Sequence, residues 1–238
     1  MYTMQGIVRK GINNATVQMD RLGGIANNIA NYTTNGYKSI TFEQVMREDG
    51  YLMNTTRSNF ATGSTRATNN PYDVALTDIG FIPVVSPEGE IAYTRDGSFK
   101  QGKDGYLITS DGWLVGDGIQ IPSNCYNFTI KENGEVVTKD SIDGAEKKIG
   151  TIPLVRFDNP EGLKSADMNR LVPTEASGQA KLVKNPNCFR QNNVEISNVN
   201  MYESLNDILR VNASLLASTK MMKVADDMYN KAINIRES

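Results

Sequence analysis

Histidine is absent from this 238-residue chain. Without imidazole, histidine-based catalytic triads and imidazole metal sites are excluded, and so is the commonest general base. Cysteine is almost absent too. Cys125 and Cys188 stand far apart with no CxxC spacing, which favours two small buried apolar residues and leaves a disulfide between them open. The lack of His and the scarcity of Cys exclude many enzyme mechanisms, and we expect no catalytic residue, cofactor or metal site.

The chain also lacks a long apolar run and an excess of positive charge. No stretch is apolar enough to span a bilayer, so we expect no direct membrane insertion. The formal net charge is −2, which gives no basic field for phosphate backbones, so we expect no nucleic-acid partner. The first residues lack the apolar segment and cleavage site of a secretory signal. The protein is therefore expected to stay in the cytoplasm or to leave by a route that removes nothing.

Proline and glycine are missing from parts of the chain. All eight prolines lie between Pro71 and Pro186, and no glycine follows Gly178, so the two ends differ from the middle. In the middle, glycine-containing turn motifs separate apolar or alternating runs, which predicts mostly antiparallel strands over 72–184. Trp113 is expected to pack on the sheet. The turn motifs are SPEGE (86–90), RDGSF (95–99), GKDGY (102–106), SDGW (110–113) and KENGEV (131–136).

The N-terminal end has helical spacing instead of turn signals. Apolar or small residues recur in steps of three and four, and TTNGYK (33–38) ends the pattern because Asn35 and Gly36 tolerate the left-handed conformation. Asparagines crowd the end of this helix. Since a neutral amide both donates and accepts, we expect them to bond neighbouring helices, the alternative being a solvated face. The stripe is Met1, Met4, Val8, Gly11, Ala15, Met19, Leu22, Ala26 and Ile29.

The C-terminal end has a sustained heptad. Large residues recur every seven positions, and small ones follow each of them by three, which lets a partner helix approach closely. Asn200 with Glu203 resembles a capping box and marks the expected start of the helix. The large series is Met201, Ile208, Leu215, Met222 and Tyr229, and the small series is Ser204, Val211, Ser218, Ala225 and Ala232.

These patterns predict an α+β fold, with a central antiparallel all-β domain and long terminal helices paired as a coiled coil. Each helix has only a narrow apolar stripe, and a long helix gains most of its stability by packing such a stripe. The predicted segments are an N-terminal helix (1–40), a connector (41–71), the β domain (72–184), a return linker (185–197) and the C-terminal helix (198–238).

Several motifs, in this order, resemble the flagellar rod and hook protein family. NNIANYTTNGYKS (27–39) is similar to its asparagine-rich N-terminal signature, and the stretch from EISNVNMYES (195–204) onward is similar to its C-terminal helix. The middle segments NNPYDVALTDIGFIPVV (69–85), AYTRDGSF (92–99), DGYLITSDGWLV (104–115) and IQIP (119–122) resemble the β domain of the rod members. The resemblance extends over nearly the whole chain.

The resemblance implies a structural subunit that polymerises helically into the drive shaft crossing the periplasm. Its partners would be copies of itself and other rod proteins, with no small-molecule substrate. Export would use the flagellar type III apparatus, with no cleaved signal. By resemblance, the signature residues lie at subunit contacts: Asn27, Asn28, Ile29, Ala30, Asn31, Gly36, Tyr37, Ser197, Asn198, Val199 and Asn200. We place Met201, Ile208, Leu215, Met222, Ala225, Tyr229 and Ala232 there as well.

Other interpretations stay open at this stage. The single small β domain and the short connector MREDGYLMNTTRSNFATGS (46–64) favour a proximal rod member over a distal one. A non-flagellar coiled-coil binding or fibre module would use the same helices. A carboxylate-dependent cell-wall hydrolase is the least favoured class, because its candidate acids sit mostly in turns. Those acids are Asp73, Asp78, Asp96, Asp104 and Asp111.

Overall fold

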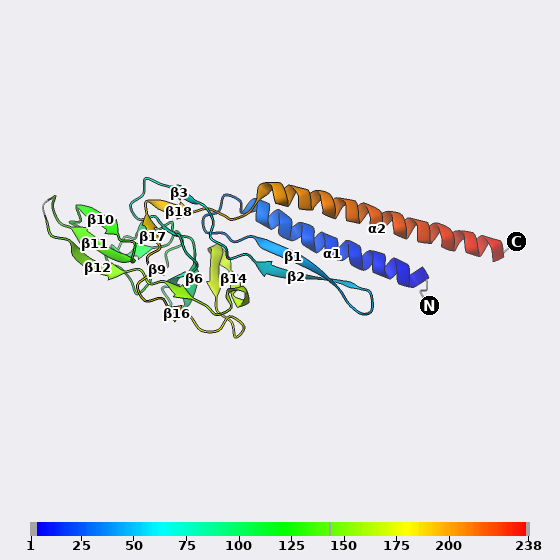
Figure 1. Ribbon diagram of the computed structural model, residues 1–238, viewed down its shortest axis with the longest axis horizontal. Helices are drawn as coiled ribbons and strands as arrows, with labels where there is room; N and C mark the ends of the chain where they lie inside the picture. The colour runs from blue at the N-terminus through cyan, green and yellow to red at the C-terminus, as the bar shows by residue number, and fades with distance from the viewer. Residues whose placement is uncertain (1–3, 143, 237–238) are drawn as a thin grey trace. The chain divides into compact units, whose positions relative to one another are not determined.

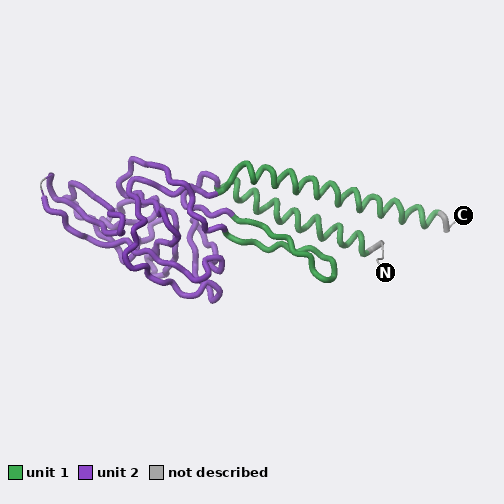
Figure 2. The backbone as a smooth tube through the Cα atoms, viewed as in Figure 1, with its two compact units in different colours: residues 1–31, 40–58, 199–238 green, residues 32–39, 59–198 purple. Residues whose placement is uncertain are grey.

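The computed structural model describes residues 4–142 and 144–236, and the chain divides into two compact units (Figure 2). Unit 1 comprises residues 1–31, 40–58 and 199–238, and unit 2 comprises residues 32–39 and 59–198. Helices α1 (Met4–Ala30) and α2 (Met201–Arg236) belong to unit 1. Antiparallel strands make up most of the regular structure of unit 2, so the α+β class and the central antiparallel β domain are confirmed.

Unit 1 consists of the two helices and a hairpin of strands β1 (Ile40–Met46) and β2 (Leu52–Ser58), which lie alongside one another (Figure 1). Gly11 of α1 lies against Met222 of α2, and Arg21 forms an ion pair of 3.2 Å with Asp207. Because residue numbers rise along α1 as they fall along α2, the helices run antiparallel. The hairpin packs on α1, where the ring of Phe42 fills the space beside Gly24.

The buried residues of α1 do not follow the single predicted stripe. Val17, Gln18, Ile25 and Asn28 are buried, whereas Met19 is 59% exposed. Ala26 is exposed as well, and Met1 lies outside the described residues. Placing Met19 and Ala26 on the buried face was wrong, because α1 packs against two partners, α2 and the hairpin, and its buried residues therefore cover a different arc.

The heptad of α2 agrees with the burial of the helix as far as Ala225 and not beyond it. The helix begins after Asn200, whose side-chain oxygen accepts hydrogen bonds from the amides of Tyr202 and Glu203 at 3.1 and 3.3 Å. The small series is buried from Ser204 to Ala225, while Ala232 is exposed. The 36 residues of α2 exceed the 27 of α1, so the last turns of α2 extend past the part of α1 that the structure describes.

Unit 2 contains a seven-stranded antiparallel sheet and several smaller ones (Figure 1). Two 3₁₀ turns, Pro160–Gly162 and Asp167–Asn169, flank β14. The large sheet has the order β14 (Lys164–Ala166), β15 (Arg170–Val172), β6 (Ile91–Thr94), β5 (Ile82–Val85), β9 (Leu114–Val115), β8 (Leu107–Ile108) and β7 (Lys100–Gln101). The others are β10 (Asn127–Ile130), β11 (Glu135–Lys139) and β12 (Lys147–Thr151); β4 (Val74–Leu76) with β17 (Phe189–Gln191); β3 (Thr65–Ala67) with β18 (Asn193–Glu195); and β13 (Val155–Arg156) with β16 (Lys181–Leu182).

Four of the five turn motifs join neighbouring strands as predicted. SPEGE, GKDGY, SDGW and KENGEV connect β5 to β6, β7 to β8, β8 to β9 and β10 to β11. One glycine in each turn has a positive φ: Gly89, Gly105, Gly112 and Gly134. The prediction for RDGSF was wrong. Gly97 is needed there because its α-carbon approaches the Val74 backbone so closely that a Cβ would collide with the Val74 carbonyl.

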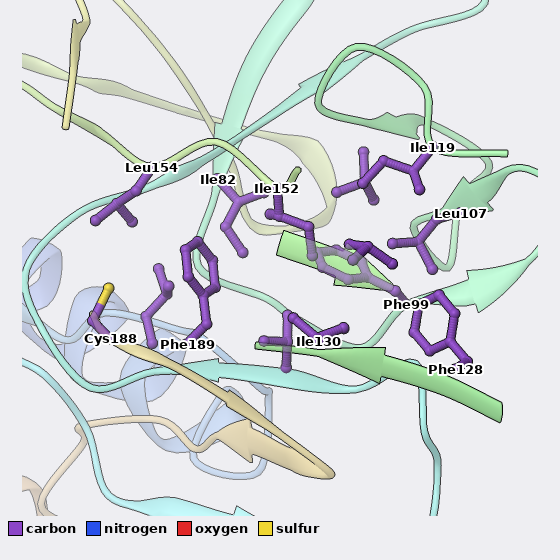
Figure 3. Packing of buried hydrophobic residues seen from close by; sticks show 14 of the residues in the cluster. Ile82, Phe99, Leu107, Ile119, Phe128, Ile130, Ile152, Leu154, Cys188 and Phe189 are labelled. Carbon is purple, nitrogen blue, oxygen red and sulfur yellow. The ribbon is translucent and has the colours of Figure 1, made fainter. Parts of the chain in front are cut away.

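The main core of unit 2 is one cluster of aliphatic and aromatic side chains drawn from several sheets. Phe99, Phe128 and Phe189 lie among Ile and Leu residues that point toward one another (Figure 3). Cys188 is buried in this cluster, whereas Cys125 is half-buried and packs on it, and both are free thiols. The prediction of two small buried apolar residues is therefore confirmed for Cys188 and only in part for Cys125.

Trp113 lies at the surface of the large sheet, half-buried just before β9. The guanidinium of Arg170 covers its ring at 4.1 Å from the ring centroid and also pairs with Asp111. Its indole ring therefore packs against the protein, in agreement with the expectation for Trp113.

Replacing Gly97 by alanine tests the close backbone approach. We expect Gly97→Ala to lower the free energy of unfolding by about 2–3 kcal/mol, because the collision is with backbone and cannot be relieved by a rotamer change. Urea denaturation followed by Trp113 fluorescence would measure it. Gly102→Ala is the matched control, since its Cβ would meet mainly the flexible end of Ile108, and should cost less than about 1 kcal/mol. Equal losses would contradict the assignment.

Candidate functional site

The two signature segments that are far apart in the sequence meet inside unit 2. The Gly36 amide donates to the Glu195 carbonyl at 2.8 Å, and the Asn198 amide donates to the Tyr37 carbonyl at 3.4 Å. The Ser39 amide donates to Oδ1 of Asn198 at 2.7 Å. The signature junction is defined here as residues 36–39, 59–63 and 195–198. All of its segments adjoin the points where the chain passes from one unit to the other.

A buried ion cluster lies at the centre of the signature junction. The side chain of Glu195 is 0% exposed, and its Oε1 accepts hydrogen bonds from Lys38 Nζ at 2.6 Å and from the Gly63 amide at 2.7 Å. Its Oε2 accepts from Arg95 Nε at 2.8 Å. Lys38 also donates to the Ala61 carbonyl at 2.6 Å. One carboxylate thus connects residues from β18, from the segment after α1 and from the loop after β6.

The cluster holds two cations against one anion, which sets its electrostatics. Burial, and after it the positive charge of Arg95, lowers the pKa of Lys38 to about 8, although Glu195 acts in the opposite direction. Arg95 also donates from Nη1 to the Gly80 carbonyl at 2.7 Å. Breaking one partner of a buried ion pair typically costs about 3–5 kcal/mol, because the remaining charge is left without compensation. Replacing any one of Lys38, Arg95 and Glu195 by an uncharged residue should therefore be strongly destabilising.

Asn28 fixes the start of the hairpin to α1 within unit 1. Its side-chain Nδ2 donates to the Ile40 carbonyl at 2.8 Å, and its Oδ1 accepts from the Ile40 amide at 2.9 Å. Asn13 bonds Leu52 in the same two-sided way, at 3.2 and 2.7 Å. These amides therefore bond a strand of their own chain, whereas Asn14 does reach a neighbouring helix, at Ser218.

The remaining predicted contact residues differ in exposure. Asn27 and Ala30 are exposed at the end of α1, Ile29 and Asn31 are half-buried, and Asn31 bonds back to Asn27 at 2.9 Å. Gly36 has a φ of 68°, as its expected left-handed turn requires. The half-buried side chain of Tyr37 has a pKa raised by burial. Ser197 and Val199 are buried, Met201, Ile208, Leu215 and Met222 are half-buried, and Tyr229 is 53% exposed.

Sequence reasoning missed the ion cluster and the hairpin. Lys38 directly follows the NGY part of the first signature, and Glu195 opens the second, so an unmatched charge in each was the available signal. For the hairpin, the signal was Asp49–Gly50, whose glycine has a φ of 78° at the turn between β1 and β2. The hairpin occupies much of the segment designated as a connector.

Asp78, Asp96 and Asp111, three of the five aspartates weighed as catalytic acids, have local partners. Asp78 pairs with Arg156 at 2.6 Å, and Oδ1 of Asp111 accepts from the Thr109 hydroxyl at 2.6 Å. Asp96 accepts from the Ser98 amide at 2.9 Å, and burial raises its pKa. Across residues 4–142 and 144–236, no group of three His, Cys, Asp or Glu side chains could hold a metal ion. In the same residues, neither helix is apolar enough over a sufficient length to cross a bilayer.

Two comparisons with known proteins give the same family, one over the middle of the chain and one over most of its length. Residues 75–138 match the family model described as the flagellar hook protein FlgE/F/G D1 domain. The flagellar basal-body rod protein FlgG of Buchnera aphidicola subsp. Schizaphis graminum is 31% identical, and the match covers 90% of this chain and 93% of that protein. This chain belongs to the flagellar basal-body rod protein family. The resemblance seen in the sequence motifs is thereby confirmed.

Other rod proteins match at similar levels. The rod protein FlgG of Caulobacter vibrioides is 32% identical over 73% of this chain and 68% of its own length. The rod protein FlgF of the same Buchnera strain is 26% identical over 98% of this chain and 99% of its own length. The family-model match covers residues 75–138, from β4 to β11, whereas the FlgF match covers 98% of the chain and so extends into both terminal helices.

Removing the Asn28 amide should destabilise unit 1. Asn28→Ala leaves the amide and the carbonyl of Ile40 without this partner, so we expect a loss of about 2–3 kcal/mol in the free energy of unfolding. Asn27→Ala is the matched control on the adjacent exposed position and should change stability by less than about 0.5 kcal/mol. Chemical denaturation followed by helical circular dichroism measures both. Similar losses in the two variants would contradict the role given to Asn28.

The buried Lys38 should make stability rise with pH in a defined window. Its folded pKa of about 8 lies below the ordinary value of 10.5, so between these values the unfolded chain binds a proton that the folded chain has released. From pH 7.5 to 9.5 we expect a gain of about 2 kcal/mol from this residue alone. The test compares urea denaturation of the wild-type chain and Lys38→Met at both pH values. Parallel pH profiles would show that Lys38 does not titrate as stated.

Proposed function

We propose that this chain is a structural subunit of the flagellar basal-body rod, polymerising helically into the shaft that transmits motor torque across the periplasm. The observation that carries the proposal is the match to rod proteins over about nine-tenths of the chain. Relatives named as rod proteins favour a structural role over catalysis. Copies of the chain and other rod proteins are the partners, and the flagellar type III apparatus is the export route.

The helices are proposed to form a coiled coil that belongs to the inner tube of the rod. The alternation of large and small residues along α2, and the burial of Ser204, Val211, Ser218 and Ala225, support close antiparallel packing. Residues 1–40 and 198–238 then serve as the inner-tube helices, 41–71 and 185–197 as connecting segments, and 72–184 as the outer domain. The signature residues and the α2 series are proposed as contacts between subunits.

Position within the rod stays a prediction. The short segment 46–64 favours a proximal over a distal member, and the relatives' names FlgG and FlgF state no position. Immunogold electron microscopy of isolated basal bodies, with an antibody against the β domain, would decide between the two ends of the rod. Label confined to the end nearest the inner membrane supports the proximal member.

Bulky substitutions at two small positions of α2 test the assembly function. Ala225→Leu overpacks a buried site and should cost about 1–3 kcal/mol in helix packing as well as lowering assembly. Ala232→Trp lies at an exposed position, so the monomer should remain as stable as wild type while assembly is weakened. Sedimentation and negative-stain electron microscopy measure assembly, with Ala232→Ser as the control. Wild-type assembly of both variants would refute the proposed contacts.

A further inference from the structure

Each helix of unit 1 carries a second stripe that faces solvent. The positions on α1 recur in steps of four and three, and those on α2 in steps of three and four, which is the spacing of a coiled-coil seam. All twelve residues are exposed and none is charged. The α1 outer stripe is Ile12, Thr16, Met19, Gly23, Ala26 and Ala30. The α2 outer stripe is Tyr202, Leu205, Leu209, Asn212, Leu216 and Thr219.

Gly23 is an independent sign that something approaches the α1 outer stripe. A glycine inside a helix lowers helix stability, so it needs a reason. Gly11 and Gly24 have one within the chain, because a Cβ would collide with Met222 and with Phe42. At Gly23 a Cβ would meet nothing within 4 Å. Nothing among the described residues therefore requires this glycine, and it lies in the middle of an exposed stripe.

The two outer stripes are complementary in length and size. At 1.5 Å per residue, the α1 outer stripe extends over about 27 Å and the α2 outer stripe over about 26 Å. The α1 outer stripe narrows to Gly23, Ala26 and Ala30, whereas the α2 outer stripe presents large side chains, with Leu209 67% and Leu216 62% exposed. Large side chains opposite small ones permit close helix packing.

We propose that the α1 outer stripe of one copy packs against the α2 outer stripe of a second copy of this chain. This contact rests on the proposed function, since it supplies one interface of the polymer. Within a single chain the two helices already meet through other faces, along the line from Gly11 and Met222 to Arg21 and Asp207. A contact between two different patches is heterologous, and repeating it without closure produces a filament.

A second copy fits these stripes better than an unrelated partner. One molecule provides both surfaces, with equal numbers of layers and the same heptad spacing, and neither has a charge that a basic or acidic ligand would require. This one contact explains both why leucines of α2 are exposed and why a glycine stands at position 23, where a side chain would meet nothing within the chain. Apolar stripes of this length on a soluble helix mark interaction surfaces.

Gly23→Leu separates this contact from monomer folding. Because leucine has a higher helix propensity than glycine and the Cβ position is open, the thermal midpoint of the monomer should stay equal or rise. Filling the space that the second copy occupies should raise the critical concentration for assembly at least tenfold. Asp20→Leu is the control, an exposed position of α1 outside the stripe, and should assemble like wild type. Unchanged assembly of Gly23→Leu would overturn the proposal.

Cysteine cross-linking identifies the contacting faces directly. In a Cys125→Ser, Cys188→Ala background, one chain carries Ala26→Cys, and a second chain of different tag length carries Leu205→Cys, Leu209→Cys, Asn212→Cys or Leu216→Cys. Disulfides between the two chains are expected for at least one pairing and not for Asp20→Cys with Glu203→Cys. Filaments without such a cross-link would refute this contact and leave the rod function standing. Failure of the wild-type chain to assemble at any concentration would refute both.

Discussion

The carboxylate of Glu195 is the constraint on which the arrangement of unit 2 depends. It accepts hydrogen bonds from Lys38, the Gly63 amide and Arg95, so a single side chain ties together segments separated by as many as 157 positions along the chain. Burying three charges is costly unless each is paired and hydrogen-bonded. A packing that separated these groups would leave buried charges without partners, so the cluster disfavours it.

Two asparagine side chains of unit 1 make the pair of hydrogen bonds that a neighbouring strand backbone would otherwise make. An amide offers one donor and one acceptor at the spacing of a peptide group, and Asn13 and Asn28 each use both on a strand residue of the hairpin. A helix surface normally presents no ladder of hydrogen bonds to a neighbouring strand. Two asparagines on one face of α1 provide a short equivalent, which fixes the hairpin in position along the helix.

Local repetition explains which parts of the fold could be predicted from the sequence. The heptad of α2 and the Asp-Gly or Asn-Gly hairpins depend on residues near one another, and both were found. Met19 and Ala26 were misplaced because their spacing fits a stripe, while the hairpin, which was not predicted, draws α1 residues such as Val17 and Asn28 inward. The Lys38–Glu195 pair was missed because no local pattern relates residues so distant, and the only signal was one charge in each signature segment.

The β domain is a continuous insertion between segments of unit 1. From Asn59 to Asn198 the chain runs continuously within unit 2, and the residues at both ends of that run are bonded to each other: Asn198 donates to the Asn59 carbonyl at 2.8 Å, while the Asn59 amide donates to Ser39. Because hydrogen bonds join the two ends of this inserted segment, its length has little effect on unit 1. Loops distant from those ends can lengthen or shorten while the points where the chain enters and leaves the segment keep the same spacing.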